Sequence, residues 1–313
     1  MDLLTGMRIF THVVEANSFS AASDRLGLSR AAVSKHIARL EAHLGGRLLN
    51  RTTRRISLTE AGQAYLERCK QILEDVADAE CVVSGLSTEP RGSLRLNVPM
   101  SFGITQVAPL LPRFSARYPR VDIELSLNDR LIDVVDEGYD LVIRIAELQD
   151  SNLIARRLAT SRHVICASPG YLDRHGRPAT PADLATHACL RYSYMQHSRE
   201  WLFIGTDGEQ RVRISGPLLT NNGGAICTAA ENGLGIALLP TFIAGHALRE
   251  GKLERVLAAY DCPQLGIYAV YPSNRHLSAK VRAFIDFLEN EFSDPPGWDR
   301  AVFSGTGATP APD

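Results

Sequence analysis

The sequence predicts an all-α N-terminal domain with a long linker helix, joined to an α/β domain that consists of two subdomains. Three observations predict this division. The chain has 313 residues, which is enough for two or three domains. Apolar residues recur at helical spacing near the N-terminus, and strands and helices alternate further along. Residues 1–70 hold 11 basic and 6 acidic side chains, whereas the remaining residues hold 23 and 29.

The composition excludes several classes of protein. The chain is 45% apolar and 22% charged, which is typical of globular proteins and argues against disorder, a coiled-coil rod or a collagen-like repeat. No apolar stretch approaches the roughly 18 residues that a membrane-spanning helix needs, and the amphipathic residues 1–10 do not resemble an export signal. The six cysteines form no C-x-x-C pair, as expected for reduced thiols. We therefore expect a cytoplasmic protein.

The first three predicted helices have the order of a helix-turn-helix. The first helix ends at the polar pair Asn17-Ser18, and either Ser18 or Ser20 can cap the second. Gly27 then provides a tight turn before the third helix, which stops at residues 45–46. The apolar face of this third helix consists of Val33, Ile37, Leu40 and Leu44. A tight turn followed by a basic helix is typical of a recognition helix.

A basic hairpin is predicted after the third helix. In residues 47–58, two short apolar pieces flank an arginine-rich tip, as in the β-hairpin wing of a winged helix-turn-helix, so we assign residues 1–58 to this domain. A basic run by itself is usually only a solvated surface. Here it lies beside an amphipathic basic helix, which favours binding to DNA phosphates and grooves. The candidate DNA contacts are Ser20, Ser29, Arg30, Ala31, Ser34, Lys35, Arg39, Arg51, Arg54 and Arg55.

The next segment, residues 59–88, is predicted to be a linker helix. Its apolar residues alternate at steps of four and three, namely Tyr65, Cys69, Ile72, Val76, Ala79, Val83 and Leu86. This spacing could dock the helix on its own domain, but the narrow strip favours a partner helix and therefore a dimer. A dimer would present two recognition helices about one DNA turn apart. Residues 89–93 are predicted to form a hinge.

Residues 94–292 are predicted to fold as the α/β domain. Alternating apolar residues predict strands at 94–98 and 121–127, and helices are predicted after the first strand and at 131–135. This order predicts a doubly wound, mostly parallel sheet.

The chain is expected to cross between two sheets, which divides the α/β domain into two subdomains with a cleft between them. Residues 163–167 are predicted to begin the second sheet, and the strand at 265–271 and the helix at 277–288 are expected to return to the first. The last segment, 293–313, is rich in Pro and Gly and is expected to be a disordered tail.

The N-terminal motifs resemble those of LysR-type transcriptional regulators. They are Phe19-Ser20-Ala21-Ala22, Leu26-Gly27-Leu28-Ser29, Ala32-Val33-Ser34, Leu40-Glu41 and Leu58-Thr59-Glu60-Ala61-Gly62. The likeness continues to about Phe292 through shorter motifs at 140–144, 166–169, 233–237 and 275–278. One departure is Arg30-Ala31, where the family commonly has Gln-Pro. A guanidinium at that position favours a guanine edge.

The resemblance implies how the protein works. It implies a periplasmic-binding-protein-like effector domain, in which subdomain I comprises residues 94–162 and 267–292 and subdomain II comprises residues 163–266. It also implies a dimer or tetramer that binds an interrupted palindrome in double-stranded DNA, and contact with RNA polymerase. A small effector in the cleft would then shift the DNA-bound assembly between bend states and so alter transcription.

The effector site is expected where strands end and helices begin, at Pro99–Phe102 and Thr220–Gly224. Two helix N-termini facing one cleft would favour a carboxylate, so we expect an organic acid. The candidate contacts are Ser101, Phe102, Asn128, Arg144, Phe203, Asn221, Asn222 and Gly223. Ser101 could instead be only an N-cap and Asn222 only a turn residue. Arg144 could pair with a neighbouring carboxylate.

Catalysis, a metal and a cofactor are not expected. The sequence holds no G-x-S-x-G elbow, no H-E-x-x-H and no phosphate-binding G-x-x-x-x-G-K-[ST]. Peroxide-responsive members of the family use cysteine pairs, but Cys189 and Cys227 lie 38 positions apart and are expected to be buried thiols. A different hypothesis is a solute-binding or enzymatic α/β domain whose N-terminal helices serve only dimerisation.

Overall fold

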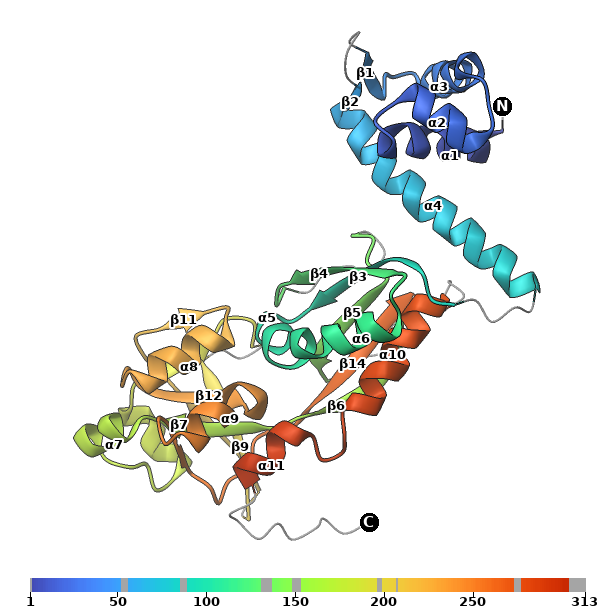
Figure 1. Cartoon of the computed structure of the whole chain (residues 1–313). Helices are drawn as coiled ribbons and strands as arrows, with labels where there is room; N and C mark the ends of the chain where they lie inside the picture. The colour runs from blue at the N-terminus through green and yellow to red at the C-terminus, as the bar shows by residue number, and fades with distance from the viewer. Residues whose placement is uncertain are drawn as a thin grey trace. The chain divides into compact units, whose positions relative to one another are not determined.

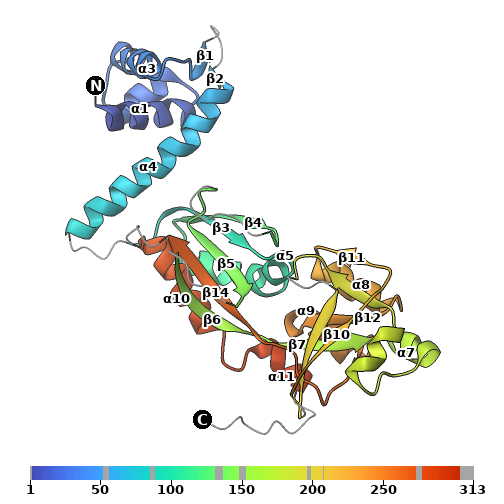
Figure 2. The same cartoon turned by 180° about the vertical axis from the view of Figure 1, so that it is seen from behind.

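The computed structural model describes residues 2–51, 56–84, 89–130, 137–147, 153–195, 199–206, 208–272 and 277–303. Its contacts divide the chain into two units, Met1–Thr88 and Glu89–Asp313 (Figures 1 and 2). The predicted helix at 131–135 lies outside the described residues. None of the described helices is both long and apolar enough to cross a membrane.

The N-terminal unit is a winged helix-turn-helix followed by a long helix. Its elements are α1 (Leu3–Glu15), α2 (Phe19–Leu26), α3 (Arg30–Leu44), the antiparallel pair β1 (Leu49–Arg51) and β2 (Ile56–Leu58), and α4 (Glu60–Ser84). Ser18, rather than Ser20, caps α2 by accepting a hydrogen bond from the Ala21 N–H. Gly27 and Gly45 end α2 and α3 in the left-handed conformation.

The core of this unit lies between the three short helices and the start of α4. Phe10, Val33, Ile37 and Leu40 are fully buried in it. Leu44 was predicted on the same face, but it is exposed, because it lies in the last turn of α3 beyond the packed core.

The first sheet of the α/β unit is mixed. Its strands are β3 (Gly92–Val98), β4 (Val121–Leu127), β5 (Leu141–Ala146), β6 (Leu153–Ser161) and β14 (Leu265–Pro272), in the order β4-β3-β5-β14-β6. β3 is parallel to β4 and β5, whereas β14 is antiparallel to β5 and β6. The expectation of a mostly parallel sheet is therefore wrong for these strands. The reason is that β14 returns from far along the chain and inserts between β5 and β6.

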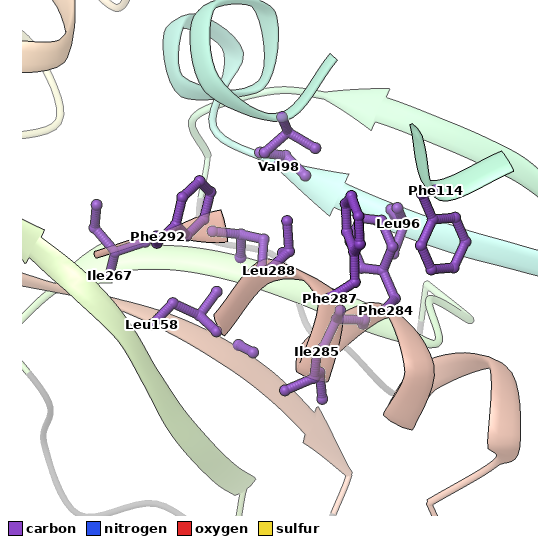
Figure 3. Packing of buried hydrophobic residues seen from close by; sticks show 14 of the residues in the cluster. Leu96, Val98, Phe114, Leu158, Ile267, Phe284, Ile285, Phe287, Leu288 and Phe292 are labelled. Atoms are coloured by element: carbon purple, nitrogen blue, oxygen red, sulfur yellow. The ribbon is translucent and has the colours of Figure 1, made fainter. Parts of the chain in front are cut away.

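Helices cover the first sheet and enclose its core. A continuous helical stretch follows β3, with α5 (Met100–Phe102), a π-helix (Gly103–Val107), a 3-10 turn (Ala108–Leu110) and α6 (Leu111–Arg117), and α10 (Ala279–Glu291) packs beside it. Figure 3 shows how the rings of α10 meet α6: Phe284 and Phe287 lie 4.9 and 5.4 Å from the ring of Phe114. This aromatic packing fixes the helical stretch on the sheet.

The second sheet is also mixed. Its strands are β7 (His163–Ala167), β8 (Cys189–Tyr192), β11 (Leu219–Thr220), β12 (Ile236–Pro240) and β13 (Glu254–Val256), in the order β11-β8-β12-β7-β13. Only the β11–β8 and β12–β8 pairs are parallel among these described strands. The helical elements are α7 (Pro169–His175), a 3-10 segment (Pro181–Thr186), α8 (Gly223–Glu231) and α9 (Thr241–Arg249), and β9 (Glu200–Gly205) pairs with β10 (Gly208–Arg213) as a separate hairpin.

The C-terminal segment contains a helix that the sequence analysis missed. α11 (Gly297–Phe303) packs against α9, and Trp298, Val302 and Phe303 contact buried apolar clusters. The expectation of a disordered tail from residue 293 is therefore wrong for this helix. Its apolar side chains bury against the α/β unit in spite of the flanking Pro and Gly residues.

Candidate DNA-binding and effector-binding sites

The exposed face of α3 carries most of the predicted DNA contacts. Arg30, Ala31, Lys35 and Arg39 are exposed, and Ser34 is half-buried. The three cations make no ion pair with a carboxylate in the part of the chain that the structure describes. Their charges are therefore available to a phosphate or a base edge.

Two further predicted contacts lie at helix starts. Ser29 is exposed, but its Oγ already accepts a hydrogen bond from the Ala32 N–H at 3.1 Å and so caps α3. Ser20 is exposed in the first turn of α2. Ser29 therefore sets where the recognition helix begins, whatever else it contacts.

The wing is attached to the recognition helix by a carboxylate that the sequence analysis did not single out. Glu41 Oε1 accepts hydrogen bonds from the N–H groups of Leu48 and Leu49 at 2.9 and 3.1 Å. Glu41 stands in the Leu40-Glu41 motif, so one residue of the pair fills the core and the other fixes the start of β1. The signal that could have identified Glu41 is a charged residue within a motif, close to the turn that ends α3.

The other end of the wing is fixed to α4 by two residues of the 58–62 motif. Thr59 Oγ1 donates to the Arg47 carbonyl at 2.7 Å and accepts from the Gly62 N–H at 2.9 Å, so it caps α4. A Cβ on Gly62 would lie 2.0 Å from the Leu48 carbonyl oxygen. Only glycine permits this close approach of α4 to the wing.

The arginines of the wing tip are not placed. Arg51 ends β1, but its side chain is outside the described part of the structure, as are Arg54 and Arg55 entirely.

The predicted seam of α4 divides into two parts. Cys69 is fully buried, and Tyr65 packs against the core of the N-terminal unit. These two residues therefore dock α4 on its own domain rather than on a partner helix. Ile72 is 37% exposed and Val76 is half-buried, whereas the side chains of Ala79, Val83 and Leu86 are not described.

The two predicted effector loops meet in the α/β unit. The Gly224 N–H, in the first turn of α8, donates to Ser101 Oγ at 3.2 Å. Asn222 caps α8 by accepting from the Ala225 N–H at 2.8 Å, and its Nδ2 lies 3.0 Å from Met100 Sδ. A Cβ on Gly223 would lie 2.6 Å from Ile243 Cδ1, so a side chain there would displace the end of the Ile243 side chain. The structure thus brings Ser101, Asn222 and Gly223 together.

A carboxylate of the protein itself occupies the start of α5. Asp129 Oδ1 accepts a hydrogen bond from the Met100 N–H at 2.7 Å, and Tyr192 at the end of β8 donates to the same carboxylate. Burial raises the pKa of Asp129 above its usual value of 3.8, although these hydrogen bonds oppose the shift. Burial also raises the pKa of Tyr192. The sequence analysis missed Asp129, which directly follows the predicted contact Asn128.

Two predicted aromatic walls are core residues. Phe102 is fully buried in the first core, where its ring lies 5.1 Å from Phe242, and Phe203 is fully buried in the core of the second sheet. Neither side chain can form the wall of a binding site in this structure. Strand and helix periodicity did not reveal which face of each element packs inward.

The remaining predicted contacts are polar. Asn128 Oδ1 accepts from the Arg130 N–H at 3.2 Å, which makes it a turn residue. Asn221 is exposed. Arg144 is paired with Tyr268 across β5 and β14, and its neighbours Ile143 and Ile145 on β5 pack into the first core. Because side chains alternate along a strand, Arg144 points away from that core.

The cysteines of the α/β unit are buried thiols. Cys166, Cys189, Cys227 and Cys262 are free and buried. Burial raises the pKa of Cys189 and of Cys227 to about 12, and Glu231 adds to the shift at Cys227. Their thiolate forms are therefore scarce at neutral pH.

Comparison with known proteins assigns both units of the chain. Residues 4–63 match the family described as bacterial regulatory helix-turn-helix protein, lysR family, and residues 87–293 match the LysR substrate binding domain. An HTH-type transcriptional regulator of Haemophilus influenzae is 41% identical over 281 residues, which cover 90% of this chain and 98% of that protein.

Two solved structures resemble the whole chain. The LysR-type transcriptional regulator CrgA of Neisseria meningitidis has a TM-score of 0.61 at 35% identity and covers 92% of this chain and 98% of its own. The virulence activator AphB of Vibrio cholerae has a TM-score of 0.59 at 29% identity, with 93% and 99% covered. These relatives are named as regulators rather than enzymes. The chain therefore belongs to the LysR family of transcriptional regulators, with an N-terminal helix-turn-helix domain and an α/β effector-binding domain.

Proposed function

We propose that this cytoplasmic regulator binds an operator as a dimer through α3 and the wing, under the control of a carboxylate-bearing effector. In this proposal Arg30, Ala31 and Ser34 meet base edges, with Ser20 and Ser29 beside them. Lys35 and Arg39 meet phosphates. The wing residues Arg51, Arg54 and Arg55 bind the adjacent groove of the DNA. RNA polymerase is a further partner.

One observation carries the DNA-binding part of the proposal. The exposed face of α3 holds cations without a described carboxylate partner, on a helix whose opposite face is fixed in a core. A phosphate contact from each cation would release counterions, which makes binding sensitive to salt.

The test separates base contacts from phosphate contacts. Arg30→Ala should relax the preference at one base pair in each half-site by roughly 1–3 kcal/mol. Lys35→Ala should weaken binding to every sequence and reduce the salt slope by about one unit. Arg8→Ala, which removes an exposed arginine of α1, is the control. If Arg30→Ala keeps the wild-type ratio between operator and scrambled DNA, the assignment of Arg30 to a base edge is wrong.

Dimerisation is proposed to use the part of α4 beyond its own domain. Ile72 is exposed and Val76 is half-buried, and both lie C-terminal to the docked Tyr65 and Cys69. Ile72→Glu should shift the protein toward monomer in analytical ultracentrifugation, whereas Glu67→Lys, an exposed neighbour, should not. An unchanged sedimentation coefficient for Ile72→Glu would exclude this surface.

The effector is proposed to bind where Ser101 meets α8. The Ser101 hydroxyl accepts from Gly224, so its own hydrogen is available to donate to a ligand. The N-terminus of α8 adds a positive dipole end. Since Asp129 already occupies the Met100 N–H, a ligand carboxylate would be received at α8 rather than at α5.

A panel of short organic acids, each paired with its uncharged amide, tests this site by thermal shift. Acids should raise the melting temperature more than their amides do. Ser101→Ala should remove the difference without changing operator binding, whereas the exposed Ser215→Ala should not. Equal shifts from acids and amides would rule out carboxylate recognition.

A further inference from the structure

The C-terminal helix α11 contacts both halves of the α/β unit. Trp298 packs into the core of the first sheet, with its ring 5.8 Å from Phe102 and 5.5 Å from Phe292. Val302 and Phe303, one turn further along, pack against the cluster that joins the second sheet to its helices. A seven-residue helix thus spans the two apolar cores. It begins beyond residue 293, where the match to the LysR substrate binding domain ends.

A buried carboxylate links α11 to the point where the chain first crosses between the sheets. Asp299 is 1% exposed, and its Oδ1 accepts from Thr241 Oγ1 at 2.5 Å. Its Oδ2 lies 3.5 Å from Nε of Arg162, the single residue between β6 and β7. The Thr241 N–H also donates to the Arg162 carbonyl at 2.9 Å. Asp299 and Thr241 therefore hold the crossing residue from its side chain and its backbone.

Aromatic contacts strengthen the same attachment. The guanidinium of Arg162 lies 5.5 Å from the ring centre of Phe303, and that of Arg255 in β13 lies 5.1 Å from it. α11 also packs against Gly245 of α9, where an added Cβ would make an ordinary contact, 3.5 Å from a methyl group of Val302. The contacts of α11 thus involve α9, β13 and the crossing.

The second crossing lies beside the first. His163, which begins β7, forms a hydrogen bond with the backbone of Pro263, just before β14 returns to the first sheet. Both connections between the sheets are therefore tied together next to the residue that α11 holds. A segment that holds one crossing where the two are joined restrains how far the two halves can rotate about them.

We propose that α11 is a hinge strap, which restrains the rotation of the two subdomains by binding both cores and the crossing residue Arg162. The inference does not depend on the identity of the effector. A helix that only filled a surface groove would stabilise the unit without acting on the crossings in particular. The two possibilities predict different patterns of hydrogen exchange.

The first experiment compares two truncations of the full chain by hydrogen–deuterium exchange. One ends after Phe303 and keeps α11, whereas the other ends after Asp294 and lacks it. The strap predicts that only the shorter chain exchanges faster at 161–164, 241 and 264–266, by about ten-fold or more, while β3 and β4 keep their protection. Equal exchange in the two truncations, or a uniform increase throughout both sheets, would overturn the proposal.

Point variants keep the inference testable if the shorter chain does not fold. Asp299→Asn preserves an acceptor for Thr241 but loses the charge that faces Arg162, and Asp299→Ala loses both. Exchange at 161–164 should rise in the order wild type, Asp299→Asn, Asp299→Ala. The control is Asp286→Asn on α10, which removes a surface ion pair with Arg156 of β6 and should leave these amides unchanged. Wild-type exchange in both Asp299 variants would reject the strap.

Discussion

The recognition face of α3 and the junction between α5 and α8 are both proposed as binding sites, but they differ in how their polar groups are satisfied. On α3 the cations project into solvent without a described carboxylate partner. At the junction, Gly224 donates to Ser101 and Tyr192 donates to Asp129. Each of these bonds joins a segment of the first sheet's subdomain to a segment of the second sheet's subdomain. In the proposed sites, the cations of α3 are open to DNA, whereas Ser101 would donate its remaining hydrogen to a ligand from a junction that is already bonded internally.

The largest expected effect tests whether the DNA-binding surface is rigid. Gly62→Ala would place a Cβ 2.0 Å from the Leu48 carbonyl oxygen, so α4 and the wing must separate. We expect a loss of about 3 kcal/mol in stability of the N-terminal unit, with loss of operator binding. Gly46→Ala is the matched control, because nothing lies within 4 Å of its Cβ position. Calorimetry measures the stability of the two variants, and titration with operator DNA measures their binding. Equal stability of Gly62→Ala and Gly46→Ala would contradict the rigid attachment of α4 to the wing.

A smaller effect is expected when only the wing is loosened. Glu41→Ala removes the acceptor of two N–H groups, and a hydrogen bond to a charged group contributes about 1.5–3 kcal/mol. Operator affinity should fall while the ranking of operator sequences stays the same, since α3 is intact. Fluorescence anisotropy with a set of single-base operator variants measures this, with Glu67→Ala as the control. A changed ranking would show that Glu41 acts on base contacts as well.

The junction should respond to pH through Asp129. The folded state raises the pKa of this carboxyl above 3.8, so folding favours its neutral form. Its contribution to stability is fully present below pH 3.8 and is lost as the pH rises through the raised value. Asp129→Asn should therefore raise the melting temperature more at pH 7 than at pH 3.5. Denaturation scans at the two pH values check the sign, and a larger gain at the acidic pH would refute it.

The same carboxyl sharpens the proposal for the effector. A ligand carboxylate at α8 would face the charge of Asp129, so acid binding should strengthen in Asp129→Asn and lose part of its pH dependence. An amine ligand should bind the variant more weakly than wild type. Isothermal titration with whichever compounds the thermal-shift panel yields distinguishes these outcomes.

The smallest effect is expected at the cysteines. Burial holds the pKa of Cys189 and Cys227 at about 12, so both should react slowly with a thiol-specific reagent at pH 7. Peroxide should leave operator binding and the melting temperature unchanged. Rapid labelling of Cys227 in the folded protein, followed by mass spectrometry, would refute this expectation. The result decides whether the α/β unit responds to oxidants as well as to ligands.

Local signals predicted the N-terminal unit well because they act over a few residues. Ser29 and Gly45 mark the ends of α3 through capping chemistry, which the sequence states directly. Long-range packing was harder to predict. The position of β14 between β5 and β6 depends on a return over about a hundred residues, so the mixed sheet could not be inferred from strand spacing.

The errors at the effector site have a similar physical origin. Phe102 lies at a strand-to-helix turn, and its sequence context is the same whether the ring faces a cleft or the core. Only the positions of Phe242 and Trp298 decide the question. Trp298 and Val302 do stand one helical turn apart, so α11 could have been predicted from its spacing despite Pro295 and Pro296.

The position of β14 also affects how the protein is made. Residues 265–272 form the strand between β5 and β6, so the first sheet stays incomplete until the ribosome has synthesised nearly the whole chain. The helix-turn-helix can fold long before that point, because domains generally fold as units from the N-terminus during synthesis. Nascent chains would therefore expose the edges of β5 and β6 beside a folded DNA-binding domain. A premature stop before residue 265 should yield an aggregation-prone fragment rather than an unregulated repressor or activator.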